Sequence, residues 1–457
     1  MRARVLLVVA IAYLLACTAC KSRPPGDILL VTVDTLRADH MGLYGYPRPT
    51  TPRVDAWFAD DRAMVFERSY STSASTPPSI VSLLSGRTPP EHGVRLFHQL
   101  LAKDVPLVPD LLPDAYATAA FVSNVVLTDE ALGIAGRFDH YDDFVDERES
   151  SRELIYERRA ERTTDAALAW LPSVPRERPV FVWVHYIDPH GPYRAPPDRP
   201  VHFTHDEPIP IDPVRVPRYQ REPGVRDGAR YVDRYDEEIA YTDLHVGRLL
   251  DGFTALRSAD DALVVFSADH GETMMDHEQW FTHGYYVYEQ IIHVPLMIRG
   301  PGMPRGRFDA VVSGIDVAQT ILGFVTGAPR VATDARDLAA GAIPADRIVW
   351  SEAAAGLSHR AAVSRDGKWV VSADPTGTVR EREYFDLAAD PAESQRQPWD
   401  GSPAAGRDWL AGAVASDPDP GGFPAEYARG SSLTGPKVAD RVSEPDRERL
   451  RALGYVD

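Results

Sequence analysis

The chain has 457 residues, enough for one large domain or two, and 44% of them are hydrophobic, which suffices for a sizeable core. Its formal net charge of −18 disfavours nucleic acid and anionic membrane surfaces as partners, and no run of lysine or arginine indicates a nucleic-acid patch. Both cysteines, Cys17 and Cys20, lie in the first twenty residues, which excludes a disulfide framework, a cysteine nucleophile and a thiolate metal site from the rest of the chain.

The first twenty residues have the composition of a targeting segment. Two arginines precede an apolar run from Val5 to Ala16, which is too short to span a bilayer but matches the hydrophobic region of a signal peptide. Leu14–Cys17 resembles a bacterial lipobox, and Cys20 is the weaker lipidation candidate. The sequence therefore predicts a lipoprotein-type signal peptide over residues 1–20, export to the bacterial periplasm or cell surface, and membrane attachment only through a lipid anchor at Cys17 or Cys20.

Short runs rich in β-branched residues alternate with helical patterns along the next 300 residues. Helices are predicted over Glu153–Leu171 and Tyr235–Leu256. Buried strands are predicted over Asp27–Val33, Tyr116–Val122, Pro179–Tyr186, Ala262–Ala268 and Val294–Gly300. This alternation predicts an α/β fold with a doubly wound, mostly parallel sheet flanked by helices.

Composition divides the chain into a catalytic domain over residues 27–327, a small C-terminal α+β subdomain over 328–400 and a loosely structured tail over 401–457. Antiparallel strands are expected on either side of Pro375–Gly377, and the tail is rich in glycine, proline and alanine. Eight prolines between Arg194 and Pro223 predict a long, stiff loop, which is either a wall that shapes the substrate site or a surface insertion.

Polar residues follow four of the predicted strands, where each strand ends. They are Asp34, Asn124, His190, and the pair Asp269 and His270. Ligands of open α/β sheets bind outside the carboxyl ends of the strands, so these side chains are candidates for one site. Two carboxylates and an imidazole suit a hard or borderline divalent cation, and an oxygen-rich site with one histidine admits Ca, Mg, Mn or Zn.

The segment Ser75–Arg87 places a hydroxyl, Thr76, before two prolines and an apolar run that ends at Gly86. Proline suits the first turn of a helix and glycine suits its C-terminal stop, so this pattern predicts a helix with Thr76 at or near its N-cap. A plain cap would contribute about 1 kcal/mol of stability. A helix N-terminus also attracts tetrahedral anions, and a metal-bound threonine there would be a nucleophile for a phosphoryl or sulfuryl centre.

Taken as a set, several segments resemble the sulfatase family of the alkaline phosphatase superfamily. The resemblance runs from about Asp27 to Glu393, in family order. Its segments are Asp27–Tyr46, Ser75–Val94, His185–Tyr193, Ser267–Glu272, Thr282–Gly302 and Glu383–Ser394, and the closing Arg451–Asp457 is also similar. The resemblance implies an alkaline phosphatase-like sheet with one divalent metal ion at its C-terminal edge.

The resemblance also implies roles for individual residues. It assigns Asp34, Asp269 and His270 as metal ligands, with Thr76 as nucleophile and fourth ligand. His190 and His283 match positions that contact the oxygens of the transferred group or protonate the leaving group, and Asn124 lies where relatives place a group near the substrate. The implied partner is a small-molecule, glycan or lipid ester, not nucleic acid.

The chain departs from sulfatases proper at the modification motif. In the family a cysteine or serine, followed by a proline and an arginine, is converted to formylglycine, whereas here Thr76 takes the first position and Ile80 that of the arginine. Shifting the register by one puts Ser75 first and Ser79 at the arginine position, so neither register restores the motif and no formylglycine is expected. The two lysines that usually bind sulfate are also replaced, one by Val122–Val125 and one near Thr282–His283.

These features predict a metal-dependent hydrolase that cleaves sulfate or phosphate esters through a metal-bound threonine. Phosphate mono- or diesters are favoured on chemical grounds, because the lysines and the arginine are replaced. The alternatives are a true sulfuric ester hydrolase of arylsulfatase type, a phosphoethanolamine-type transferase, and a catalytically silent metal-binding lipoprotein.

Overall fold

The computed structural model describes residues 26–419, except residues 98, 146–156, 198, 259–260, 329–330 and 332. The predicted signal peptide, with Cys17 and Cys20, and the end of the predicted tail lie outside the described residues, so export and lipid anchoring stay predictions. Within the described part of the chain, no helix is both long enough and apolar enough to cross a membrane.

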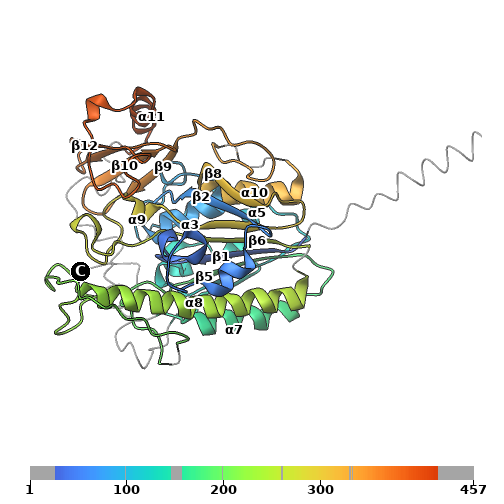
Figure 1. Ribbon diagram of the computed structural model, residues 1–457. Helices are drawn as coiled ribbons and strands as arrows, with labels where there is room; N and C mark the ends of the chain where they lie inside the picture. Colours follow the sequence, from blue (N-terminus) through green and yellow to red (C-terminus); the bar gives the residue numbers. More distant parts are fainter. Residues whose placement is uncertain are drawn as a thin grey trace, which may run out of the picture.

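The main domain is built on an eight-stranded sheet with the strand order β4-β3-β5-β1-β6-β7-β2-β8 (Figure 1). Its strands are β1 Ile28–Val33, β2 Met64–Tyr70, β3 Ala117–Val122, β4 His140–Asp142, β5 Val180–Tyr186, β6 Leu263–Ala268, β7 Leu296–Arg299 and β8 Gly306–Ser313. Only β7 runs antiparallel to its neighbours. All five predicted strands are therefore confirmed, as is the mostly parallel sheet.

Helices cover both faces of this sheet, with α7 and α8 on one side and α3 and α10 on the other (Figure 1). The helices of the main domain are α2 Pro52–Trp57, α3 Thr76–Ser85, α4 Pro89–His92, α5 Val108–Leu111, α6 Asp129–Leu132, α7 Ala160–Trp170, α8 Gly228–Arg257, α9 Glu289–Ile292 and α10 Ile315–Thr326. The helix predicted from Glu153 is wrong at its start, because residues 157–159 are not helical. The helix predicted from Tyr235 begins earlier, at Gly228, where the Asp227 side chain caps it.

Strand residues alternate between two hydrophobic layers, as the period of two in a strand requires. Leu30 and Val265 pack in the layer under α3 and α10, together with Ile321. The neighbouring Leu29 packs in the opposite layer with Leu250 of α8. Both faces of the central strands are thus buried, which explains why their sequences are continuous apolar runs rather than alternating ones.

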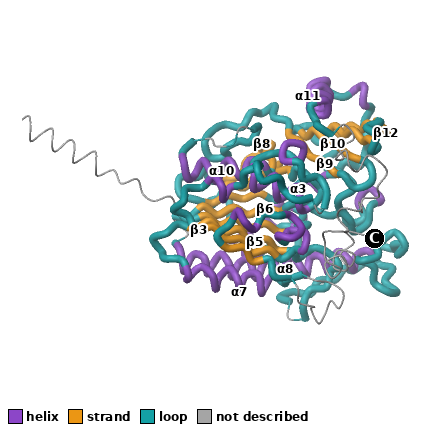
Figure 2. The backbone as a smooth tube through the Cα atoms, turned by 180° about the vertical axis from the view of Figure 1, so that it is seen from behind, coloured by secondary structure: helices purple, strands orange, loops and turns teal. Residues whose placement is uncertain are grey.

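A second sheet of four antiparallel strands, β12-β11-β10-β9, forms the predicted C-terminal subdomain and lies next to β8 (Figure 2). Its strands are β9 Val349–Ala353, β10 Ser358–Val363, β11 Lys368–Ala373 and β12 Val379–Phe385. The predicted loosely structured tail is wrong at its beginning, because Ala404–Ala415 forms helix α11. Leu410 of this helix is buried with Trp350 and Trp369 of the sheet, a tertiary contact that glycine- and alanine-rich composition does not reveal.

A buried ionic cluster ties the end of the described chain to the main domain. The Arg95 guanidinium lies between Glu352 of β9, at 2.9 and 2.6 Å, and Asp417 beyond α11, at 2.7 and 3.0 Å. Arg95, Glu352 and Asp417 are all buried. Each carboxylate receives two hydrogen bonds from this one guanidinium, an arrangement that only arginine can supply.

We expect Arg95→Ala to lower the free energy of unfolding by about 3–5 kcal/mol, because it leaves two buried carboxylates without their shared counter-ion. Equilibrium urea denaturation followed by circular dichroism measures this change. Arg248→Ala, which breaks an exposed ion pair with Asp165 at 2.6 Å, is the matched control and should change stability by less than about 1 kcal/mol. Equal effects of the two variants would contradict the structural role of the cluster.

Candidate active site

The candidate site forms where three adjacent parallel strands, β5, β1 and β6, end in register. Asp34 follows β1, and Asp269 and His270 follow β6. Thr76 is the first residue of helix α3, and its hydroxyl lies at the same place, beside Asp34 and His270. All four side chains are fully buried, so the structure brings the predicted metal ligands together in one interior cluster.

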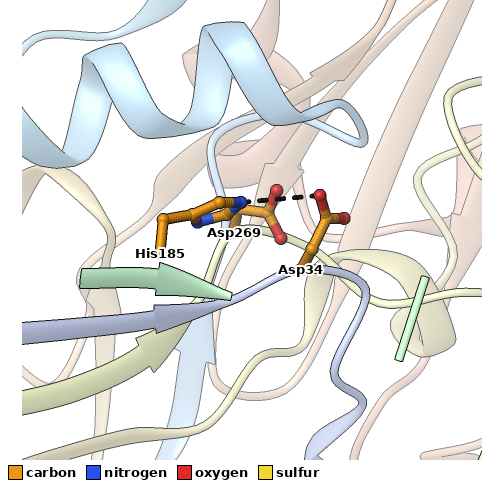
Figure 3. A group of neighbouring side chains, drawn as sticks. All are labelled: Asp34, His185 and Asp269. Carbon is orange, nitrogen blue, oxygen red and sulfur yellow. Dashed lines mark ion pairs between the residues drawn. The ribbon is translucent and has the colours of Figure 1, made fainter. Parts of the chain in front are cut away.

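Two carboxylates and a histidine of this cluster have the spacing of a metal site (Figure 3). Asp34, His185 and Asp269 each offer one ligand atom, and these atoms all lie within 4.8 Å of one another. Among the described side chains, Asp34 Oδ1, His185 Nε2 and Asp269 Oδ2 are buried atoms without a hydrogen-bond partner. Buried polar atoms are rarely left unpaired, and oxygen and imidazole donors suit a divalent cation, so these residues fit the ion that the fold implies.

His270 directs its second nitrogen at the same carboxylates. Its Nδ1 lies 2.9 Å from the Gly271 carbonyl oxygen, which can only accept, so Nδ1 carries the hydrogen and Nε2 of the neutral ring is an acceptor. That Nε2 lies 3.5 Å from Asp269 Oδ2 and 3.9 Å from Asp34 Oδ1. A backbone carbonyl that fixes the ring in this way is typical of metal-bound histidines.

The Thr76 hydroxyl contacts the cluster directly. Its Oγ1 lies 3.4 Å from Asp34 Oδ2, to which it donates, and 3.2 Å from His270 Nε2. Ser75 is the N-cap of α3 and Thr76 is the first helical residue, so the prediction that Thr76 lies at or near the N-cap is confirmed. The Thr76 side chain makes no capping bond and instead faces the carboxylates. Gly86 ends the helix in the left-handed conformation, as predicted.

Asn124 is also part of the cluster, but its amide is committed to protein groups. Its Nδ2 donates to Asp34 Oδ2 at 2.5 Å, and its Oδ1 accepts from the Val126 backbone N–H at 3.1 Å. The side chain thus fixes the orientation of Asp34. We therefore assign Asn124 to positioning a ligand, a narrower role than the predicted one near the substrate.

His185 was not predicted as a candidate ligand. His185 pairs with Thr32 across β5 and β1, and its Nε2 lies 3.5 Å from Asp34 Oδ2. On the other side, its Nδ1 lies 2.8 Å from Thr32 Oγ1, which also accepts from Trp183 Nε1 at 2.9 Å. The position one residue before the end of a central strand was the only available signal, and a core histidine would look the same in the sequence.

His190 and His283 lie side by side next to this cluster. Their ring centroids are 5.1 Å apart, and that of His283 is 4.6 Å from that of His270. Burial lowers the pKa of His190 to about 4. Burial would also lower the pKa of His283, but the hydrogen bond from its Nδ1 to Glu272 at 3.0 Å and the charge of Glu272 outweigh burial and raise it. Two neighbouring imidazoles with pKa values moved apart suit acid and base roles.

We expect repulsion between the buried carboxylates Asp34 and Asp269 to lower the free energy of unfolding of the metal-free protein. Burial and the charge of Asp34 raise the pKa of Asp269 above the ordinary value of 3.8. The folded state then holds a proton that the unfolded state has lost, so this group lowers the free energy of unfolding as pH rises above 3.8. In a chelator, Asp269→Asn should therefore unfold at a higher temperature than wild type, with a gap that widens as the pH rises above about 4.

Differential scanning calorimetry checks this expectation. Added Mn²⁺ should raise the unfolding temperature of the wild type and leave that of Asp269→Asn nearly unchanged, because a ligand stabilises only a protein that binds it. A constant gap between the two proteins across this pH range would contradict the expectation.

Comparison with known proteins identifies the family. The Sulfatase family model matches residues 27–328, so the chain belongs to the sulfatase family. It is 34% identical over 168 residues to a choline-sulfatase of Rhizobium meliloti (strain 1021), a match covering 35% of this chain and 31% of that protein. It is 24% identical over 274 residues to arylsulfatase K of Rattus norvegicus, covering 51% and 48% respectively. These matches therefore span about a third to a half of the length of the two curated relatives.

Solved structures share the whole fold at low identity. A phosphonate monoester hydrolase of Agrobacterium radiobacter has a TM-score of 0.70 at 18% identity, covering 86% of this chain and 95% of its own. A protein solved with its substrate D-glucosamine-2-N,6-O-disulfate has a TM-score of 0.69 at 18% identity, covering 87% and 99%. This likeness confirms the predicted alkaline phosphatase-like architecture.

Proposed function

We propose that this chain is a metal-dependent hydrolase that cleaves a sulfate or phosphate ester through Thr76, with phosphate mono- or diesters as the favoured substrates. The observation that carries this proposal is the position of the Thr76 hydroxyl. It lies at the first residue of a helix, within 3.4 Å of Asp34 and 3.2 Å of His270, beside buried carboxylate oxygens that have no hydrogen-bond partner.

The proposed ligands of one divalent ion are Asp34, Thr76, Asp269 and His270, with His185 as an alternative or additional ligand. A bound divalent ion would lower the pKa of the Thr76 hydroxyl and neutralise charge on the ester. The residues do the remaining work. Asp34 Oδ2 accepts the hydrogen bond of the Thr76 hydroxyl, which leaves lone pairs of Oγ1 for attack.

The reaction balances with groups of this chain. The Thr76 oxygen bonds to phosphorus or sulfur as its proton passes to Asp34 Oδ2, which accepts its hydrogen bond, and the bond to the leaving alcohol breaks. His283, whose pKa is raised, donates a proton to that leaving oxygen, and His190, whose pKa is lowered, lies beside it as a neutral imidazole. Water then cleaves the threonine ester and gives one proton back to His283, while Asp34 returns its proton to Thr76 Oγ1 and regenerates the hydroxyl. Pro77 and Pro78 have no N–H group and the Ser79 N–H bonds to the Ser75 carbonyl oxygen, so α3 contributes mainly the partial positive charge of its N-terminal end near the transferred group.

The local structure supports a threonine nucleophile over a modified residue. Ser75 is the N-cap residue and Ser79 donates to the Asp269 backbone carbonyl at 2.5 Å, so neither serine takes the place of Thr76 beside Asp34 and His270. Ile80, at the position of the family's arginine, is buried in the hydrophobic core under α3. The absence of the arginine at this position fits a mechanism in which the unmodified Thr76 oxygen attacks a phosphate ester.

A sulfuric ester is the second candidate substrate, and the match to a choline-sulfatase favours it. A substrate panel separates the two candidates. The full chain, loaded with Mn²⁺, is assayed on p-nitrophenyl sulfate, p-nitrophenyl phosphate and bis-p-nitrophenyl phosphate. Faster cleavage of either phosphate supports the proposal, whereas preference for the sulfate restores the namesake activity. Metal binding without turnover of any ester would refute the hydrolase.

A further inference from the structure

The proline-rich segment between β5 and α8 reaches into the candidate site at one point, the pair Tyr219 and Gln220. Gln220 is buried, and its amide fills the space where a Cβ of residue 191 would lie, which explains the glycine at Gly191. Its Nε2 donates to the Phe281 carbonyl oxygen at 3.5 Å. Gln220 therefore packs between the segment that carries His190 and the segment that carries His283.

Gln220 places the adjacent Tyr219 over the site. The Tyr219 ring stacks on the His190 ring, with centroids 6.1 Å apart and planes 18° apart. Unlike His190, which is fully buried, Tyr219 is half-buried. Burial and the charge of Glu272 raise the pKa of the Tyr219 hydroxyl, so it stays protonated at neutral pH. The ring thus forms a neutral surface immediately outside a buried imidazole.

The residues around the proposed nucleophile differ in their exposure to solvent. Thr76 and His190 are 0% exposed and His283 is 7% exposed. Tyr219 is half-buried, and Tyr285, two residues after His283, is 47% exposed. Tyr219 is thus a partly exposed ring in contact with an imidazole of the site, whereas Thr76 and the carboxylates beside it are fully buried. The alcohol portion of an ester held at Thr76 would have to extend away from these carboxylates toward partly exposed residues such as Tyr219.

We propose that Tyr219 is a specificity-determining residue that binds the leaving alcohol, and that this alcohol carries a ring with a flat apolar face, either an arene or a pyranose. The inference rests on the proposed function and deepens it. An aromatic side chain offers a large, rigid apolar surface on which such a ring can stack, whereas a short alkyl group gains little from it. Tyr285 lies near enough to Tyr219 to raise the pKa of its hydroxyl, and as an exposed ring it adds to this surface.

The test measures binding without turnover. In the Mn²⁺-loaded full chain carrying Thr76→Ala, isothermal titration calorimetry gives the Kd of methyl phosphate, p-nitrophenyl phosphate and glucose 6-phosphate. Adding Tyr219→Ala should weaken binding of the ring-bearing probes about 2- to 10-fold and leave the Kd of methyl phosphate unchanged. Tyr219→Phe should keep most of the ring preference. Val214→Ala, at a 75% exposed position of the same loop, is the matched control and should change none of the three values.

Each outcome decides between identifiable alternatives. Weakening of p-nitrophenyl phosphate alone assigns an aryl alcohol, and weakening of glucose 6-phosphate alone assigns a sugar. Equal weakening of all three probes, or of none, overturns the role of Tyr219. A ring preference that depends on Tyr219, in a protein whose wild type hydrolyses no ester, keeps this inference and refutes the hydrolase. Failure of all probes to bind overturns both.

Discussion

Replacing Thr76 with alanine should lower kcat/KM by about 10⁴-fold or more on any ester that the wild type cleaves. The substitution removes the oxygen that would attack phosphorus or sulfur, and no other hydroxyl of α3 replaces it next to Asp34 and His270. The Thr76 hydroxyl contacts Asp34 and His270 rather than the backbone of α3, so the helix should tolerate the change. Steady-state kinetics with the preferred p-nitrophenyl ester measures the loss.

Two further variants separate chemistry from structure. Thr76→Ser keeps a hydroxyl and should retain much of the activity, and its covalent ester should be detectable by mass spectrometry after rapid quenching. Thr320→Val removes a buried hydroxyl of α10 that hydrogen-bonds to the backbone of Asp316 and Leu338, away from the site. This variant should leave kcat/KM unchanged. Full activity of Thr76→Ala would overturn the nucleophile assignment, and a loss of folding, seen by circular dichroism, would require Thr76→Val in its place.

The second large effect is expected at Asp34. Asp34→Asn should reduce bound metal from about one ion per chain to nearly none and lower kcat/KM by about 10³-fold or more, because ligand charge is needed to hold a divalent ion. Asp34 is the one residue of the cluster that contacts Thr76, Asn124 and His185 together. Elemental analysis of the purified protein measures the metal directly, whatever the substrate.

Asp188→Asn is the matched control, since Asp188 follows β5 as Asp34 follows β1 and is equally buried. Its carboxylate accepts the Ala160 backbone N–H at 2.9 Å at the start of α7. We expect this variant to be less stable but to keep its metal. Retention of metal by Asp34→Asn would show that the ion binds elsewhere.

The same elemental analysis assigns the two histidines. His270→Gln should abolish metal binding, and His185→Gln should weaken it about 10- to 100-fold, the usual effect of losing a residue that orients a ligand. If His185→Gln abolishes metal binding and His270→Gln only weakens it, the ligand set is Asp34, His185 and Asp269. His270 is then a partner of Thr76.

Local sequence patterns predicted the parts of this protein whose conformation depends on nearby residues. The apolar runs of β1, β5 and β6 could only be buried strands, and their carboxyl ends meet because parallel strands in register end together. Asp34 and Asp269 were predictable as a pair for this reason. The residues of the Ser75–Gly86 segment likewise predicted helix α3 without any distant contact.

Other features were decided by tertiary contacts. Helix α11 packs through Leu410 on Trp350 and Trp369, which lie 60 and 41 residues earlier, and Arg95 holds Asp417 across 322 residues. His185 faces Asp34 instead of an apolar core, and Tyr219 reaches His190, only because separate segments converge there. A periodic sequence pattern predicts a single helix or strand and the face that it buries. Which distant group a side chain meets depends on how the helices and strands pack together. The sequence alone therefore determined the fold, the family and the two carboxylates, and the tertiary structure decided which hydroxyl, imidazole and phenol surround them.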